Sequence, residues 1–253
     1  MSSPQLTGSE CPSPSSRAMA KRSADVAAEK VKEAVVIPVE EVDLAKFSVK
    51  QRGKDNDKPF FYASYDHQQM VLNLTTEKWF RIAFAIERDP ERPDQKMHSF
   101  NVSVEVDAEV ANAIQKIEDV AKEIVLAAIP KAKWMDSVRQ SGSYDPVFRA
   151  KLVVKAQNEA HLSACTVREF GKAPVRGIAG DQALVPLLQA NKGFADAKVK
   201  LGVALASVYT MNGKFDECIA GVTWRITNLM ADLAENTSRT YPDIFANEEF
   251  PAQ

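Results

Sequence analysis

The sequence is poor in cysteine and has no long apolar run. Its three cysteines, Cys11, Cys165 and Cys218, are far apart and form no CxxC pair, which argues against a disulfide framework or a zinc site and suits a reducing compartment. No stretch approaches the roughly 18 consecutive apolar residues expected of a membrane-spanning helix. The first residues also lack the apolar core of a secretory signal. We therefore expect an intracellular protein with no membrane association.

Recognisable catalytic motifs are also missing. The chain contains neither a Gly-rich phosphate loop of the GxGxxG or GxxxxGK[ST] kind nor a GxSxG or HExxH sequence. The histidines His67, His98 and His161 lie far apart, so their spacing does not suggest a metal site. Glu118 and Asp119 are expected on the solvated side of a helix, where acid–base catalysis is not favoured. We expect no enzymatic activity, no cofactor and no metal.

The chain is long enough for a sizeable core but carries little net charge. It has 253 residues, of which 45% are hydrophobic and 26% charged, and its formal net charge is −2. A uniformly basic coat for nucleic acid is therefore not the default interpretation, and local charge has to be considered. Residues 1–34, rich in Ser and Pro, predict a disordered or partly helical N-terminal tail. We expect one folded domain over residues 35–233 and a short acidic C-terminal tail over 234–253.

Hydrophobic periodicity predicts strands on both sides of one long helix. The helix is expected over 108–129, where apolar residues recur every three or four positions between the N-cap Asp107 and Pro130. A second short helix is expected over 134–140. This order favours a mainly β (α+β) fold, either a β-barrel or a small α+β domain, over alternating β/α units. Apolar runs bounded by turn residues predict strands within 35–74 and over 78–87, 99–107, 146–156, 164–170, 198–213 and 218–233.

Charge is segregated along the chain. Residues 131–176 carry nine basic and four acidic side chains, a local balance of +5. Within the expected strand RAKLVVK, Arg149 and Lys151 share a face, and the same register leads to Lys155. With two aromatic residues nearby, this ladder of cations could follow a phosphate backbone, because grooves for single-stranded nucleic acid combine cations with aromatic platforms. An ordinary solvated strand face is an equally open alternative.

The last two expected strands are joined by MNGK, and Asn-Gly is the strongest short-range signal for a hairpin. In the strand that follows, Trp224 and Arg225 must point to opposite sides of the sheet. We expect Trp224 in the core and Arg225 facing outward, because aromatic residues dominate cores. Trp134 is expected to pack between the long helix and the sheet for the same reason.

Three short motifs follow one another in the chain. A Trp-containing segment precedes a Tyr-x-Pro sequence that enters the basic strand, and the hairpin VYTMNGKF with AGVTWRI comes last. This order, over residues 35–233, resembles the OB-fold single-stranded-DNA-binding proteins of large nucleocytoplasmic DNA viruses and the related replication proteins of some tailed phages. The chain departs from their pattern by inserting DECIA before Gly221. The matching residues are Trp134, Tyr144, Pro146, Tyr209, Asn212, Gly213, Lys214, Phe215, Thr223 and Trp224.

The resemblance implies an OB-like β-barrel with a helical insertion. It implies a protein that binds single-stranded DNA without sequence preference and supports DNA replication, recombination or repair. It places one lip of the groove at the Asn-Gly hairpin, where Lys214 would meet a phosphate and Phe215 would stack on a base. The expected nucleic-acid-binding residues are Arg139, Tyr144, Phe148, Arg149, Lys151, Lys155, Arg168, Lys214, Phe215 and Arg225.

The resemblance also bears on partners. Related phage proteins carry an acidic C-terminal tail with a terminal aromatic residue, which competes for the DNA groove and docks replication proteins, and EEFPAQ with Phe250 is similar in kind. Replication proteins are therefore expected partners, and the nucleus or a viral replication site is an expected location. Single-stranded RNA in place of DNA, a β-barrel structural or assembly protein of a virus-like particle, and a homo-oligomer are the alternatives that stay open.

Overall fold

The structure is a computed structural model that describes residues 34–52, 60–74, 78–86, 98–212 and 218–233. These residues belong to one structural unit that begins at Ala34. The N-terminal and acidic C-terminal tails predicted from the sequence lie outside the described residues. Within the described part of the chain, neither α-helix is both long and apolar enough to cross a membrane.

The described residues form strands and two α-helices, which confirms a mainly β chain. The helices are α2 (Ala108–Ala128) and α3 (Asp181–Ala190), and the short 3-10 helices are η1 (Val39–Glu41), η2 (Leu44–Lys46), η3 (Glu159–His161) and η4 (Lys192–Phe194). The strands are β1 (Val35–Pro38), β2 (Phe47–Arg52), β3 (Phe60–Tyr65), β4 (Met70–Asn73), β5 (Phe80–Ile82), β6 (His98–Glu105), β7 (Lys133–Met135), β8 (Val138–Arg139), β9 (Val147–Lys155), β10 (Ala164–Arg168), β11 (Val175–Ile178), β12 (Lys198–Asn212) and β13 (Cys218–Asp232).

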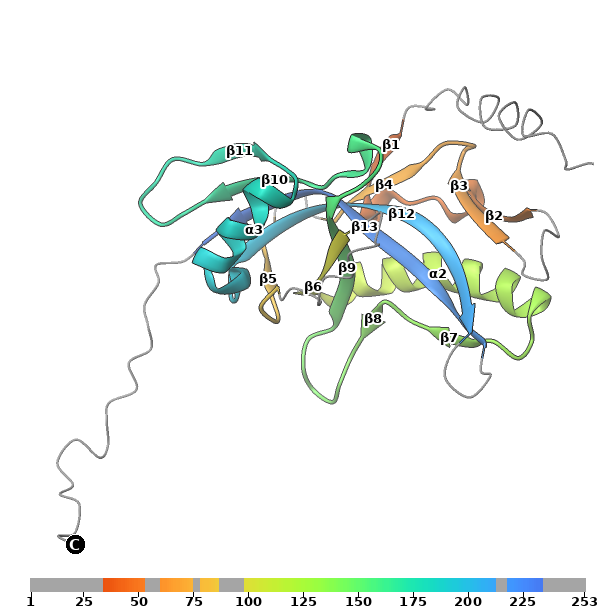
Figure 1. Cartoon of the computed structure of the whole chain (residues 1–253). Helices are drawn as coiled ribbons and strands as arrows, with labels where there is room; N and C mark the ends of the chain where they lie inside the picture. The colour runs from red at the N-terminus through yellow and green to blue at the C-terminus, as the bar shows by residue number, and fades with distance from the viewer. Residues whose placement is uncertain (1–33, 53–59, 75–77, 87–97, 213–217, 234–253) are drawn as a thin grey trace, which may run out of the picture. The chain divides into compact units, whose positions relative to one another are not determined.

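All the described strands belong to one sheet that turns back on itself. β12 and β13 form a long antiparallel hairpin, and hydrogen-bonded pairs lead from β12 through β5, β6 and β9 back to β13. This circuit of five strands closes, whereas β1 with β4, β2 with β3 and β10 with β11 extend the sheet beyond it (Figure 1). The sheet is therefore not a plain barrel, and the pairing alone does not establish the predicted OB-like fold.

The cationic strand β9 alternates as predicted over its first half only. Arg149 and Lys151 are exposed between buried neighbours. The alternation breaks at Val153, which is only 2% exposed. Ser163 is hydrogen-bonded to the backbone here, since its N donates to the Val153 carbonyl at 2.9 Å and its hydroxyl accepts from the Val153 N at 2.8 Å. Val153 therefore interrupts the cationic ladder, and Lys155 is exposed again at the end of β9.

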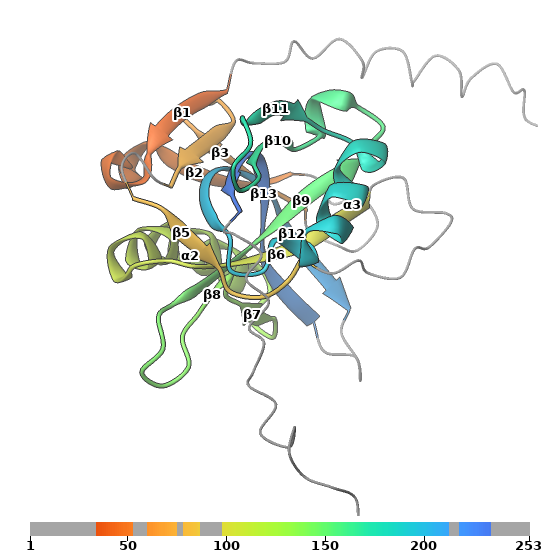
Figure 2. The ribbon, with the colours of Figure 1, turned by 90° about the vertical axis from the view of Figure 1, so that its left-hand side faces the viewer.

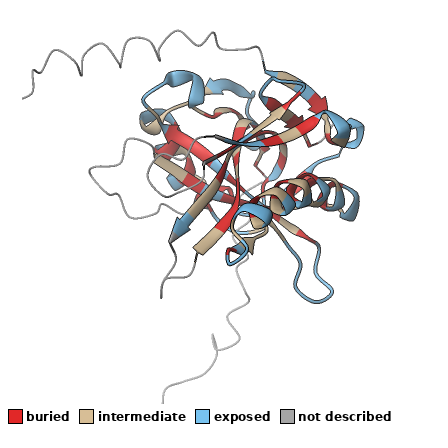
Figure 3. Ribbon diagram, turned by 90° about the vertical axis from the view of Figure 1, so that its right-hand side faces the viewer, coloured by how far each residue is buried: buried red, intermediate tan, exposed pale blue. Residues whose placement is uncertain are grey.

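The long helix begins and ends as the sequence predicts. Asp107 is the N-cap, with its Oδ1 accepting a hydrogen bond from the backbone N of Val110 at 2.9 Å, and α2 ends at Ala128, before Pro130. The helix packs on η1, β2, β8 and β13. Its buried residues lie toward the sheet and its exposed residues lie away from it (Figure 3). α3 lies elsewhere in the fold, against β9 (Figure 2).

The second predicted helix, over residues 134–140, is wrong. The segment forms β7 and β8 instead, because residues 133–135 pair in parallel with residues 219–221 of β13 and Val138 pairs with Phe148 of β9. These partners are distant in the sequence, so the local pattern could not reveal them. The segment thereby becomes part of the sheet.

Two other elements differ from their sequence patterns. α3 has no counterpart in the sequence analysis, although its buried residues Leu184, Val185 and Leu188 have helical spacing, because Pro186 within it argues against a helix. The strand expected over 78–87 is limited to β5, and Phe84 beyond it is 66% exposed. Neither difference affects the strands that carry the predicted cations.

Candidate nucleic-acid interface

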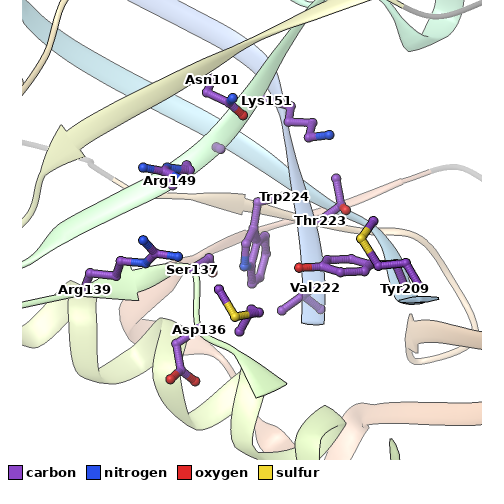
Figure 4. Close-up of a pocket in the computed structure, with 13 residues that line it drawn as sticks. Asn101, Asp136, Ser137, Arg139, Arg149, Lys151, Tyr209, Val222, Thr223 and Trp224 are labelled. Carbon is purple, nitrogen blue, oxygen red and sulfur yellow. The ribbon is translucent and has the colours of Figure 1, made fainter. Parts of the chain in front are cut away.

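A hollow of about 390 Å³ lies where β6, β7, β8, β9, β12 and β13 meet (Figure 4). The cations Arg139, Arg149 and Lys151 line it together with Tyr209, and the edge of Trp224 forms part of its floor. In the view of Figure 4, Trp224 lies between Arg139 and Tyr209. The structure therefore brings three of the predicted cations together around two aromatic residues of the proposed motif.

The hollow exists because the edge of β13 changes partner. β13 pairs in parallel with β7 at residues 219–221 and with β9 at residues 225–226, and among the described residues no strand pairs with that edge in between. A corner formed by Asp136 and Ser137 connects β7 to β8 and spans this gap. The corner is fixed to β9, since the backbone N of Arg149 donates to the carbonyl of Ser137 at 2.9 Å. The hollow opens over the intervening residues 222–224.

The three cations share one face of the sheet. Arg139 on β8 pairs with Val147, which lies two residues before Arg149 on β9, and Lys151 follows after two more residues. Alternate residues of a strand point to the same side, and all three side chains are exposed. None of them forms an ion pair with another described residue. Their charges are therefore available to an anion in the hollow.

Tyr209 of β12 pairs with Gly221 of β13 in the antiparallel register. A Cβ added at position 221 would be 2.7 Å from Tyr209 Oη and 2.8 Å from the Met135 carbonyl oxygen, so only glycine leaves room for the phenol there. Burial, followed by the charge of Glu118, raises the pKa of Tyr209, and Arg139 opposes the rise. The phenol is therefore neutral at physiological pH and half-buried beside the cations, which suits a surface on which a base could stack.

Trp224 is buried, as the sequence predicts. It is 1% exposed, and its ring packs edge-on against Phe148, with 6.0 Å between the ring centroids. Phe148 is 0% exposed, so its predicted contact with nucleic acid is wrong. The physical reason is that residues 148 and 149 point to opposite faces of β9, and the outward face belongs to Arg149.

The burial of Glu118 is the largest difference at this site between the sequence-based expectation and the structure. Glu118 was expected on the solvated side of α2, but it is 0% exposed, and only its neighbour Asp119 is exposed as expected. The Glu118 carboxylate accepts hydrogen bonds from Trp224 Nε1 at 2.7 Å, from the backbone N of Ser137 at 3.1 Å, and from the Ser137 hydroxyl. Helical spacing contained the signal, because Glu118 is four residues after the buried Ile114.

The burial of Glu118 changes its acidity. Desolvation raises its pKa from 4.5 to about 7, although the hydrogen bonds from Trp224 and Ser137 favour the ionised form. The neighbouring charges of Asp136 and Asp119 also raise the pKa. A carboxylate with a nearly neutral pKa thus lies directly beneath the cationic hollow.

Four other predicted residues lie outside the lining of the hollow. Arg225 pairs with Lys151 in the register and shares its outward face, but it is half-buried. Tyr144 is 77% exposed in the loop before β9, and Lys155 lies at the far end of β9. Arg168 on β10 is engaged by Asp232, with its Nε 2.8 Å from Oδ1.

The hairpin residues Lys214 and Phe215 lie outside the described residues, so their predicted contacts stay predictions. Asn101, Asp136 and Ser137 also line the hollow, although no sequence motif marks them as site residues. Asn101 could have been found only through its pairing with Lys151 across β6 and β9. Among the described residues, no group of three His, Cys, Asp or Glu side chains is placed to hold a metal ion.

Comparison with known proteins gives only distant similarities. No protein-family model and no curated protein matches the chain. The chain is similar to the crystal structure of gp2.5, a single-stranded DNA-binding protein encoded by bacteriophage T7, with 15% identity, a TM-score of 0.42 and coverage of 73% of this chain and 100% of that one. It is also similar to a C-terminally truncated single-stranded DNA-binding protein from bacteriophage Enc34, with 8% identity, a TM-score of 0.36 and coverage of 74% and 96%, respectively. At these scores the similarities assign no function, which has to come from the site itself.

Proposed function

We propose that this protein binds single-stranded DNA without sequence preference. The observation that supports this most strongly is the hollow on the outward face of the sheet, which Arg139, Arg149 and Lys151 line together with the half-buried ring of Tyr209. In this proposal the cations contact phosphates and a base stacks on Tyr209. Such a combination is typical of proteins that bind single strands.

The spacing of the cations suits an extended strand. Arg149 and Lys151 are two residues apart on β9, so their Cα atoms are about 7 Å apart along the strand. Side chains at this separation can contact successive phosphates of one backbone. Stacking and phosphate contacts tolerate every base, since each base has an aromatic face. Sequence-independent binding follows from these two kinds of contact.

We also propose that the closed circuit of β12, β5, β6, β9 and β13 is an OB-like barrel with α2 as its helical insertion. The cations of β9 would then lie on the outer wall of the barrel, and the hairpin between β12 and β13 would form a lip of the groove. Protection of single strands during DNA replication, recombination or repair is the role that we propose for this binding. RNA is a variant of the proposal, because a stacking platform does not read the 2′-hydroxyl.

Fluorescence anisotropy of a labelled dT oligonucleotide tests the proposal. Binding is expected at low salt, with the logarithm of the affinity falling linearly with the logarithm of the salt concentration. A duplex of the same length should compete weakly, and an rU oligonucleotide distinguishes DNA from RNA. No binding at low salt would overturn the proposal, and a large defined oligomer would then favour the assembly-protein alternative.

A further inference from the structure

A negative charge lies beneath the hollow. Glu118 is the only charged side chain of the described residues that is buried. Its three hydrogen bonds come from Trp224 Nε1 and from the backbone N and hydroxyl of Ser137, and both of these residues line the hollow. The carboxylate therefore holds Trp224, in the floor of the hollow, and Ser137, in the corner between β7 and β8, from the buried side.

We propose that Glu118 is a positioning residue for this site and takes up protons from the solvent, a fraction of a proton per site, when a polyanion occupies the hollow. This inference rests on the proposed function. An incoming phosphate adds negative charge above a buried carboxylate, and like charges in a poorly solvated region disfavour each other. Protonation removes that repulsion. The protonated carboxyl can still accept from Trp224 Nε1, while the Ser137 hydroxyl can turn to accept the new O–H.

The charged groups around Glu118 favour proton uptake. The two nearest acids, Asp119 on α2 and Asp136 in the corner, both raise its pKa, which is about 7. Glu118 raises the pKa of the Tyr209 phenol on β12, and Arg139 on β8 lowers it. An anion bound to Arg139 would offset the positive charge of this arginine. The charged residues of the other elements packed on α2 point outward: Glu40 and Glu41 on η1 and Lys50 on β2 are exposed, and Arg225 on β13 is half-buried.

The linkage has a definite sign. The bound polyanion raises the proton affinity of Glu118, so affinity for the polyanion is highest where the carboxyl is already protonated. This affinity falls as the pH rises through about 7. It levels off at a pH where Glu118 is ionised in both the free and the bound protein. A rise of half to one pKa unit on binding corresponds to roughly a three- to tenfold loss of affinity across this range.

Isothermal titration calorimetry with a dT oligonucleotide at about pH 7.5, in two buffers of different ionisation enthalpy, measures the protons taken up. The full-length chain is expected to take up a fraction of a proton per site, and Glu118→Gln is expected to take up none. Asp119→Asn, an exposed acid on the same helix, is the matched control. His161→Gln is a second control, because His161 interacts with Arg225 of β13, and burial followed by the charge of Arg225 lowers the pKa of His161.

The outcomes separate this inference from the proposed function. Binding by the unchanged protein with no proton uptake, or uptake that persists in Glu118→Gln, would overturn the inference and leave the proposed function intact. No binding in any buffer would overturn both. If Glu118→Gln does not fold, Trp224→Phe serves instead, because the Nε1 hydrogen bond that it removes lowers the pKa of Glu118, so its loss should move the pH of maximum uptake upward. An unchanged pH profile in that variant would contradict the inference.

Discussion

Removal of the three cations that line the hollow should change the salt dependence of binding by a predictable amount. In the triple variant Arg139→Ala, Arg149→Ala, Lys151→Ala, each lost phosphate contact reduces the slope of log affinity against log salt by about 0.7 for a single strand. Three contacts together account for a slope of about 2. Between about 50 and 200 mM salt, the affinity of the unchanged protein should therefore fall roughly 20-fold more than that of the variant.

The assay is anisotropy of a labelled dT oligonucleotide over a series of salt concentrations. All three side chains are exposed, so the variant should fold normally, which circular dichroism checks. The matched control removes the same charge from Lys46, Lys50 and Lys116, which are also exposed but do not line the hollow. Equal slopes for the unchanged protein and the cation variant, or an equal effect of the control, would refute the assignment of the site.

Contacts in and beyond the hollow predict four more outcomes. Gly221→Ala should weaken dT binding as much as Tyr209→Ala does, by roughly 1–3 kcal/mol, because the new Cβ displaces the Tyr209 phenol. Unchanged dT affinity of the Gly221→Ala variant would contradict this. Folding raises the pKa of Glu118 from 4.5 to about 7. The protonated carboxyl therefore contributes to stability fully below its pKa in the unfolded chain, and this contribution is lost as the pH rises through its pKa in the folded protein. Glu118→Gln should remove about 3 kcal/mol of pH dependence between about pH 5 and 8, measured by urea unfolding, and identical pH profiles would argue against it. Ser163→Ala should cost about 2 kcal/mol in the same assay, since the buried Ser163 hydroxyl accepts from one strand at 2.8 Å and donates to another at 2.5 Å; unchanged stability would count against that bridge. Arg168→Ala should leave dT affinity within about twofold, because Arg168 forms an exposed ion pair outside the hollow, and a larger loss would mean that the site extends to β10.

Local rules account for the parts of the fold that the sequence predicts well. The bounds of α2 follow from an N-cap, a helical period and Pro130, all of which are read within one segment. The alternation of Arg149 and Lys151, and the opposite orientations of Trp224 and Arg225, follow from the period of two in a strand. The same rule places Phe148 inward, so its predicted role conflicted with its own strand pattern.

The rest of the site depends on pairing between distant segments. Residues 133–135 become a strand only because β13 offers an edge to them. The Tyr209 phenol has room only because Gly221 faces it from the neighbouring strand, and the buried Glu118 carboxylate is hydrogen-bonded by Trp224 of β13 and Ser137 of the corner. Helical spacing from Ile114 indicates that Glu118 faces the sheet, but the partners in these contacts have no signature within a single stretch of sequence. The cations could therefore be identified from the sequence, but the hollow that they line could not.

Photocrosslinking of a dT oligonucleotide that contains 5-iododeoxyuridine, followed by mass spectrometry of the crosslinked peptides, tests the central claim most directly. The proposed interface predicts a crosslink to Tyr209, which should disappear in the triple cation variant. The exposed aromatic residues Trp79, Phe84 and Phe170 do not line the hollow. Crosslinks confined to those residues would contradict the claim that nucleic acid binds in the hollow.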